Sequence, residues 1–172
     1  FNLVFQSYAL FPHLNVFNNV AYGLRAAGIE GKALHAKVAE ALNLVGLEHV
    51  AKTRVDELSG GMSQRVALVR ALVREPEVLL LDEPLGALDL QLRKRMQVEL
   101  REIQRQTGAT FIYVTHDQEE ALVMSQRVVI MQSGRVVQTG TPGDVYHFPR
   151  TRFAAEFIGT ASFVPAKVVR VL

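Results

Sequence analysis

Residues 78–81, which read Val-Leu-Leu-Leu, are the feature that most constrains the fold of this chain. The run is apolar at every position, follows Pro76, and ends at the acidic pair Asp82-Glu83. A short continuous apolar run between such breaks predicts a strand buried on both faces, which is typical of a parallel sheet. Ligand sites in open α/β sheets lie at the carboxyl ends of strands, so the acidic pair is expected at such a site.

Helix and strand patterns alternate along the rest of this region. The helices repeat apolar residues on one side, and the strands are rich in β-branched and aromatic residues. Ser133-Gly134 separates the last two strands and indicates a hairpin. The pattern predicts an α/β core with a largely parallel sheet. Helices are predicted over residues 60–74, 91–106 and 118–124, and strands over residues 3–5, 110–114, 128–131 and 136–138.

A small helical unit is predicted over residues 11–57. Asn15 can cap a helix whose apolar residues are Val16, Val20 and Leu24. A second helix is predicted over residues 32–44, with its apolar positions on one face. This unit precedes the alternating region and is expected to be a subdomain.

Composition limits the class of protein. The chain has 172 residues, 49% of them hydrophobic, which suits a globular domain with a sizeable core. Its formal net charge of +2 gives no strong electrostatic signal for nucleic acid. The absence of cysteine excludes disulfides and cysteine metal sites and fits a reducing compartment. The longest aliphatic run, residues 78–81, is far too short to span a bilayer.

Residues 58–65, Leu-Ser-Gly-Gly-Met-Ser-Gln-Arg, place a glycine pair at the start of a predicted helix. Glycine lets an anion approach the backbone closely, and the free N–H groups of a first helical turn favour phosphate. Ser59 could both cap the helix and bind a phosphate oxygen. Taken alone, a plain helix start is the better interpretation of this segment.

Polar side chains follow three of the predicted strands. Asp82 could hold Mg²⁺, and Glu83 could orient or deprotonate a water; a pair of solvated loop carboxylates is the alternative. His116 follows the strand at 110–114, and an isolated histidine there is more often a cap or a packing residue. Gln6 follows the first strand and could sense metal or water. All of these residues are expected at one edge of the sheet.

The order of these segments resembles the ATP-binding cassette (ABC) ATPases. Residues 58–64 resemble their signature motif, residues 78–83 their Walker B strand, and residues 87–89 their D-loop. His116 is similar to the switch histidine and Gln6 to the Q-loop glutamine. The resemblance implies a P-loop NTPase (RecA-like) α/β core with a helical subdomain. Residues 5–13 and 114–122 are similar to the importer branch, and residues 92–97 and 157–159 look most like spermidine/putrescine importer ATPases.

The resemblance implies ATP and Mg²⁺ as cofactors and a head-to-tail pair of ATPase subunits. Asp82 and Gln6 would serve Mg²⁺, and Glu83, His116 and Gln6 would be catalytic. A second group of residues would bind the ATP that the partner subunit holds. This group consists of Ser59, Gly60, Gly61, Gln64 and Asp89.

The resemblance also implies four segments and a set of partners. Residues 1–10 would end a core strand and form the Q-loop, and residues 11–57 would dock onto transmembrane permease subunits. Residues 58–159 would complete the ATPase core, and residues 160–172 would begin a β-rich regulatory domain. The subunit would lie at the cytoplasmic face of the plasma membrane, would depend indirectly on an extracytoplasmic solute-binding protein, and would bind no nucleic acid.

Two departures from the family pattern stand out. Met62 occupies the position after the glycine pair where the family usually has glutamine, so weakened function is expected. A P-loop needs Gly-x-x-x-x-Gly-Lys-Ser/Thr, but the only Gly-Lys pair, Gly31-Lys32, precedes Ala33. We therefore interpret the chain as a fragment without the N-terminal Walker A region and expect it to bind ATP poorly by itself.

Three alternatives to a polyamine importer ATPase follow from the same residues. The chain could be a non-catalytic truncated module that acts only in trans, offering Ser59-Gly60-Gly61 to a complete subunit. It could serve an importer of another solute, such as a sugar, sulfate or iron. A soluble ABC-type ATPase of DNA maintenance is disfavoured because no extended heptad run interrupts the chain.

Overall fold

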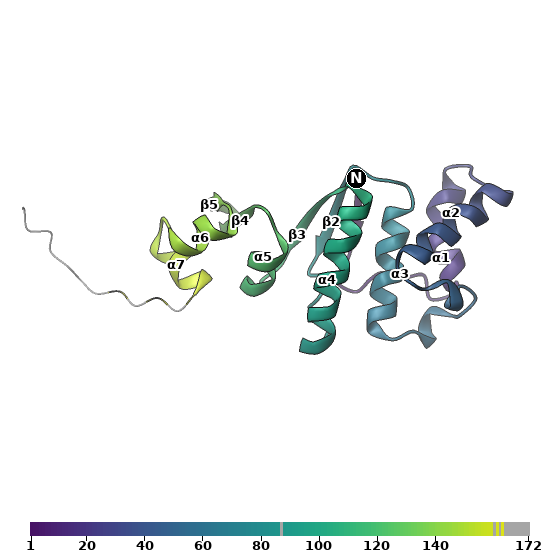
Figure 1. Cartoon of the computed structure of the whole chain (residues 1–172), viewed down its shortest axis with the longest axis horizontal. Coiled ribbons are helices and arrows are strands. Elements are labelled where there is room, and N and C mark those ends of the chain that lie inside the picture. The colour runs from purple at the N-terminus through teal and green to yellow at the C-terminus, as the bar shows by residue number, and fades with distance from the viewer. Residues whose placement is uncertain (87, 160, 162, 164–172) are drawn as a thin grey trace, which may run out of the picture. The chain divides into compact units, whose positions relative to one another are not determined.

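The computed structural model describes residues 1–86, 88–159, 161 and 163. It contains two compact units, Phe1–His116 and Asp117–Leu172, which are described one at a time (Figure 1). The four segments expected from the sequence stay a prediction. Residues 58–116 pack with the helices that precede them, so the helical segment and this part of the core form one unit.

A parallel three-stranded sheet forms the centre of the first unit. Its strands are β1 (Asn2–Val4), β2 (Val78–Asp82) and β3 (Thr110–Val114), in the order β1-β2-β3. Leu3 is paired with Leu80, and Leu80 with Ile112, so these three residues share one face. The parallel α/β arrangement predicted from the sequence is confirmed.

The two faces of this sheet differ in exposure. Val4, Leu79 and Leu81 are buried on the face against which the helices pack, whereas Leu3 and Ile112 on the other face are 39% and 45% exposed. Leu80 is only half-buried. The prediction that residues 78–81 are buried on both faces is therefore wrong for the described part of the chain, where the core lies on one side of the sheet.

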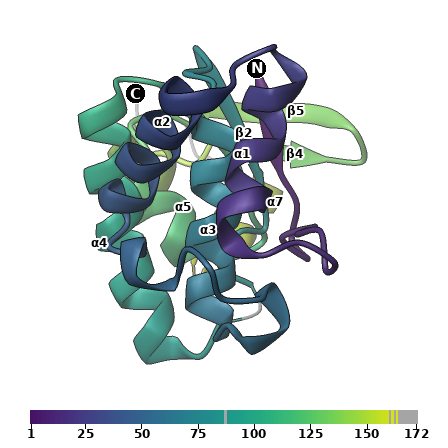
Figure 2. The same ribbon diagram turned by 90° about the vertical axis from the view of Figure 1, so that its right-hand side faces the viewer.

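Helices surround the buried face of the sheet. Helix α3 packs against β1 and against both α1 and α2 (Figure 2). Asn15 caps α1 as predicted, by accepting a hydrogen bond from the Asn18 backbone, and Gly108 ends α4 with a left-handed φ of 66°. The helices are α1 (Val16–Ala26), α2 (Gly31–Leu44), α3 (Gly60–Leu72) and α4 (Leu90–Thr107), with short 3-10 helices η1 (Glu48–Val50) and η2 (Val55–Glu57).

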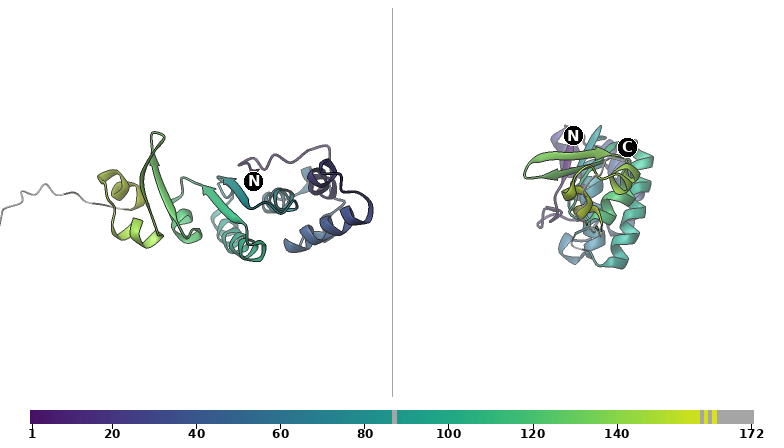
Figure 3. Two further views of the ribbon diagram at one scale, coloured as in Figure 1. Left: turned by 90° about the horizontal axis from the view of Figure 1, so that it is seen from above. Right: turned by 90° about the vertical axis from the view of Figure 1, so that its left-hand side faces the viewer.

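The described part of the second unit has a hairpin and three short helices (Figure 3). The strands β4 (Val128–Gln132) and β5 (Arg135–Gly140) are antiparallel, which confirms the predicted hairpin. Helix α5 (Gln118–Met124) was predicted, whereas α6 (Pro142–His147) and α7 (Arg152–Ile158) were missed, although Thr141 and Thr151 cap them. The start of the β-rich regulatory domain expected over residues 160–172 lies outside the described residues, apart from residues 161 and 163. The core consists of Val128, Ile130, Val145, Ala154 and Ile158.

Candidate functional site at the carboxyl ends of the sheet

The parallel sheet brings three predicted site residues to one edge. Gln6 lies two residues beyond β1, Glu83 directly after β2, and His116 two residues beyond β3. Because β2 is the central strand, Glu83 lies between the other two. The order of the strands thus assembles a cluster from positions that are far apart in the sequence.

Glu83 is the centre of this cluster. Its Oε2 accepts a hydrogen bond of 2.8 Å from Gln6 Nε2, and its Oε1 lies 2.9 Å from His116 Nδ1. A carboxylate in its ionised form only accepts hydrogen bonds, so Nδ1 carries the proton of this contact in that form. Each oxygen therefore has one donor and keeps further acceptor capacity. The Glu83 side chain is 29% exposed, so solvent can still reach this carboxylate.

The backbone of Glu83 fixes the direction of its side chain. Its φ is 44°, in the left-handed region that residues with a Cβ seldom adopt. Its N–H donates to the Val114 carbonyl at 2.8 Å, and its carbonyl accepts from Gly86 N–H at 3.1 Å. These two bonds hold the strained residue between the neighbouring strand and the turn that follows. Strain of this kind concentrates at functional sites.

Gly86 is a site residue that sequence reasoning missed. A Cβ at this position would lie 3.6 Å from both Gln6 Nε2 and Glu83 Oε2, in ordinary van der Waals contact. The glycine therefore borders the cluster directly. The only sequence signal is its place in the Glu83-Pro84-Leu85-Gly86 turn.

Asp82 lies exposed at the end of β2, next to Glu83. Among the described residues there is no group of three or more histidine, cysteine or acidic side chains that could hold a metal ion. Mg²⁺ in nucleotide sites binds through one or two carboxylates together with phosphate oxygens and water. An exposed carboxylate beside a polar cluster fits that donor set, so Asp82 and Gln6 are compatible with Mg²⁺ that arrives with a nucleotide.

The predicted phosphate-binding helix start is the first turn of α3. Ser59 caps it by accepting a hydrogen bond of 3.4 Å from Met62 N, and both Ser59 and Gly60 are exposed. Gly61 is buried, and a Cβ there would lie 3.3 Å from Leu92 Cδ1 on α4. The structure thus gives Gly61 a packing role that the sequence did not reveal, while Ser59 and Gly60 offer an accessible surface.

Gln64 differs from its neighbours in this motif. It is 1% exposed, and neither amide atom has a hydrogen-bond partner among the residues that the structure describes. Positions 64, 67, 68 and 71 recur at helical spacing, so α3 turns Gln64 inward with Ala67, Leu68 and Ala71. The Gln64 side chain therefore lies inside the unit, whereas Ser59 and Gly60 of the same motif lie at its surface.

Asp89 has a local structural role at the start of α4. Its Oδ1 accepts hydrogen bonds of 3.0 Å from both Gln91 N and Leu92 N. The side chain is exposed, so the cap leaves Asp89 at the surface. Ala87, the first residue of the predicted D-loop, lies outside the described residues.

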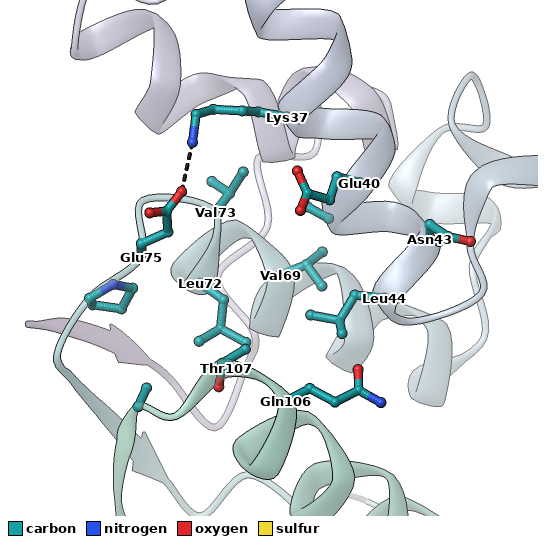
Figure 4. Close-up of a pocket in the computed structure, with 13 residues that line it drawn as sticks. Lys37, Glu40, Asn43, Leu44, Val69, Leu72, Val73, Glu75, Gln106 and Thr107 are labelled. Carbon is teal, nitrogen blue, oxygen red and sulfur yellow. Dashed lines mark hydrogen bonds and ion pairs between the residues drawn. The ribbon is translucent and has the colours of Figure 1, made fainter.

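A pocket of about 630 Å³ lies away from this site, between α2, the end of α3 and the end of α4 (Figure 4). Pro76 and Ala109 line it, and they precede β2 and β3. The pocket is therefore at the amino ends of the strands, opposite Glu83. Lys37 and Glu75 form an ion pair of 2.6 Å beside it, and this pair raises the pKa of Lys37 and lowers that of Glu75.

Within the described part of the chain, no helix has the length and apolar character needed to cross a bilayer.

Comparison with known proteins identifies related sequences. Residues 1–86 match the ABC transporter family. Over 171 residues the chain is 59% identical to the spermidine/putrescine import ATP-binding protein PotA of Frankia alni, covering 99% of this chain and 37% of that protein. It is 55% identical over 169 residues to the protein of that name from Pseudomonas fluorescens, and 56% identical over 163 residues to that from Desulfitobacterium hafniense. These matches cover 98% and 95% of this chain and 47% of each relative, so the chain spans less than half of their length.

Proposed function

The chain belongs to the ABC transporter family, and from this premise we propose that it is part of the ATP-hydrolysing subunit of an importer for polyamines such as spermidine and putrescine. The single observation that carries the chemistry is the Glu83 carboxylate, held between Gln6 and His116 at the end of the central strand. The substrate proposal rests on the relatives, which are spermidine/putrescine import ATP-binding proteins and are 55–59% identical to this chain over nearly its whole length.

Glu83 is proposed to act on the water that attacks the terminal phosphate. A carboxylate positioned by two donors can accept a proton or orient a water through its remaining lone pairs. His116 holds one oxygen of Glu83 and has a second ring nitrogen, which is proposed to reach the terminal phosphate. Gln6 donates a hydrogen bond to the other oxygen, so a movement of its amide changes the surroundings of Glu83 directly.

Asp82 and Gln6 are proposed to hold Mg²⁺ together with the phosphates. The bound ion would neutralise the negative charge that develops on the phosphoryl group. Asp82 suits this role because it is exposed at the strand end and adjacent to Glu83 in the chain. The two acids then have separate tasks, one toward the metal and one toward water.

Ser59 and Gly60 are proposed to bind an ATP held by a second subunit in a head-to-tail pair. The support is their exposure at the first turn of the thirteen-residue helix α3, where backbone N–H groups and the helix dipole favour phosphate. Asp89 is proposed to face the same nucleotide. Gly61 is assigned to packing against α4, and the Gln64 side chain is left out because it is buried.

The remaining partners follow from the same proposal. Residues 11–57 are proposed to dock onto permease subunits, which receive solute from an extracytoplasmic binding protein. The subunit would then be peripheral at the cytoplasmic face of the membrane. A trans-acting module without its own hydrolysis is the second candidate, and its support is the exposure of Ser59 and Gly60 at the start of α3.

Replacing Glu83 by glutamine tests the proposed chemistry. In the complete gene product that carries this sequence, Glu83→Gln is expected to lower kcat for ATP hydrolysis by about 100-fold or more, while ATP still binds, because the amide cannot accept the proton. Phosphate release and binding of a fluorescent ATP analogue measure the two effects.

Glu57→Gln is the matched control, since Glu57 is exposed on η2 and outside the cluster. Equal kcat values for the Glu83 and Glu57 variants would contradict the role of Glu83. Uptake of labelled spermidine, compared with a labelled sugar and with sulfate, in cells with and without the gene tests the substrate. If the 172-residue chain hydrolyses nothing yet stimulates a complete subunit, the trans-acting candidate is favoured.

A further inference from the structure

The chain just after Gln6 follows a strained path. Tyr8 and Ala9 are consecutive residues with φ of 62° and 47°, both in the left-handed region, and neither is glycine. Tyr8 N–H donates to the Phe5 carbonyl at 2.9 Å and so closes a turn that contains Gln6. Left-handed residues with a Cβ persist only where surrounding contacts hold them. Something outside this turn must therefore stabilise it.

Arg70 supplies that support from α3. Its two terminal nitrogens donate to the Ala9 carbonyl at 2.8 Å and to the Tyr8 carbonyl at 3.0 Å. Its guanidinium also lies 5.3 Å from the centre of the Phe11 ring. Burial lowers the pKa of Arg70, but an arginine stays protonated in proteins. The half-buried cation is stabilised by its hydrogen bonds to the two carbonyls and by the face of the Phe11 ring.

The far end of the segment is fixed to α1. The Phe11 N–H donates to Asn19 Oδ1 at 2.8 Å, and Asn19 Nδ2 donates to the Phe11 carbonyl at 3.2 Å. The Phe11 ring packs on that of Tyr22, with 4.5 Å between their centres. The segment that leaves Gln6 is thus attached to α1 at Phe11 and to α3 through Arg70.

We propose that Arg70 is a positioning residue that holds the turn at residues 6–9 so that Gln6 stays on Glu83, and that it joins this turn to α3, the helix that begins at Ser59-Gly60. The inference rests on the proposed function, because it gives Gln6 its role in hydrolysis. The role of Arg70 adds a link within one subunit between the residues proposed for hydrolysis, Gln6 and Glu83, and the start of α3, which is proposed to bind the ATP of a second subunit. A displacement of α3 is passed to Gln6 through a side chain outside the residues that are proposed to bind nucleotide.

Geometry distinguishes this role from simple packing. A planar guanidinium can donate to two carbonyls and lie near an aromatic face at the same time. Lysine has a compact ammonium group without this rigid planar fork, so it cannot reproduce the arrangement. Methionine keeps an apolar stem of similar length but donates nothing. If Arg70 acted only through its bulk or charge, one of these two replacements would preserve the turn.

Amide hydrogen exchange of the nucleotide-free protein tests the clamp independently of catalysis. In the complete gene product, Arg70→Met and Arg70→Lys are both expected to raise exchange at Tyr8 N–H by about tenfold or more, because the turn loses its support. Arg101→Met is the matched control, since Arg101 is exposed on α4. Unchanged protection at Tyr8 in either Arg70 variant, with the rest of the protein folded, would overturn the proposal.

Kinetics tests the consequence for Gln6. Arg70→Met is expected to lower kcat about tenfold at a nearly unchanged KM for ATP, because Glu83 loses a positioned partner. In Gln6→Ala, the further change Arg70→Met should cost less than twofold, since its target is gone. Fully additive losses, or a lower melting temperature with unchanged kcat, would contradict the proposal. A wild-type protein without ATPase activity would instead contradict the proposed function, and the exchange experiment would still decide on Arg70.

Discussion

At the residue scale, two buried amide side chains differ in whether they have hydrogen-bond partners, and this difference should set their contributions to stability. Asn19 is fully buried, and both of its amide atoms are satisfied by backbone groups near Phe11 and Leu14. Gln64 is equally buried, but neither of its amide atoms has a partner among the described residues. The burial of a polar group costs free energy unless a hydrogen bond compensates it. The two residues should therefore respond differently to the same replacement.

Replacement of each amide by leucine makes this contrast measurable. Asn19→Leu is expected to lower the free energy of unfolding by about 2 kcal/mol, because it leaves the Phe11 backbone groups without partners. Gln64→Leu is expected to change stability by less than about 1 kcal/mol or to increase it, because no bond is lost. Urea unfolding of both variants provides the values. A large destabilisation by Gln64→Leu would show that its amide is satisfied in solution.

Gln64 also shows why the motif alone could not predict the role of each of its residues. Within residues 58–65, Ser59 and Gly60 are exposed as a phosphate-binding turn requires, but Gly61 serves packing and Gln64 faces inward. A motif gives the residue types in order, whereas helix geometry decides which of them reach the surface. The motif alone could not separate these roles.

At the scale of elements, α4 shows how local sequence fixes an element. Asp89 caps its start through two backbone N–H groups, and Gly108 ends it with the left-handed φ that favours glycine. On its exposed side, Glu102 accepts hydrogen bonds from Arg105 and from Gln106, at 2.7 Å for the closest Arg105 contact. These contacts join residues three and four positions apart on one helix, so they depend on the local sequence and not on how the chain folds around it.

The pH dependence of α4 follows from Glu102. The hydrogen bond from Arg105, followed by that from Gln106, lowers the pKa of Glu102 from its ordinary 4.5 to about 2. A lowered pKa in the folded state means that the ionised form stabilises the fold above pH 4.5, and that this contribution is lost as the pH falls toward 2. The side chain is exposed, so the effect is small.

Between pH 4.5 and 2, Glu102→Gln is therefore expected to lose less stability than the wild type, because glutamine does not titrate. The measurement is the difference in melting temperature between wild type and variant as a function of pH. Glu57→Gln serves as the comparison, because Glu57 is exposed on η2. A wild-type advantage that persists unchanged at pH 2 would argue against the lowered pKa.

At the scale of the whole molecule, the first unit leaves one face of its sheet uncovered by described residues. Leu3, Ile112 and Val114 are 39%, 45% and 54% exposed there. Parallel sheets are usually covered on both faces, and exposed apolar surface promotes association. The second unit buries its own small core and is described by itself.

The 172-residue chain by itself is expected to associate at micromolar concentration through this face. Ile112→Thr should shift the equilibrium toward the monomer, because it reduces the exposed apolar surface of this face. Val98→Thr is the control, since Val98 is 69% exposed on α4. Light scattering coupled to size-exclusion chromatography measures the mass. Equal association of both variants would place the contact elsewhere.

The sequence by itself determined the elements and the chemistry available at their ends. Caps, helix periodicity and the turn at Ser133-Gly134 act over a few residues, so α1, α3, α4 and the hairpin were predicted close to their observed bounds. The position of Gln6, Glu83 and His116 after strands predicted a shared edge, because parallel strands end on the same side.

Only the tertiary structure decided which atoms meet at that edge. Gln6 and Glu83 are separated by 77 positions, Glu83 and His116 by 33, and Ala9 and Arg70 by 61, so no local rule relates them. Strand order and register set the first two contacts, and the packing of α3 against β1 and α1 sets the third. The exposed sheet face and the buried Gln64 have the same origin, because burial depends on what packs against a surface and not on the residues that form it.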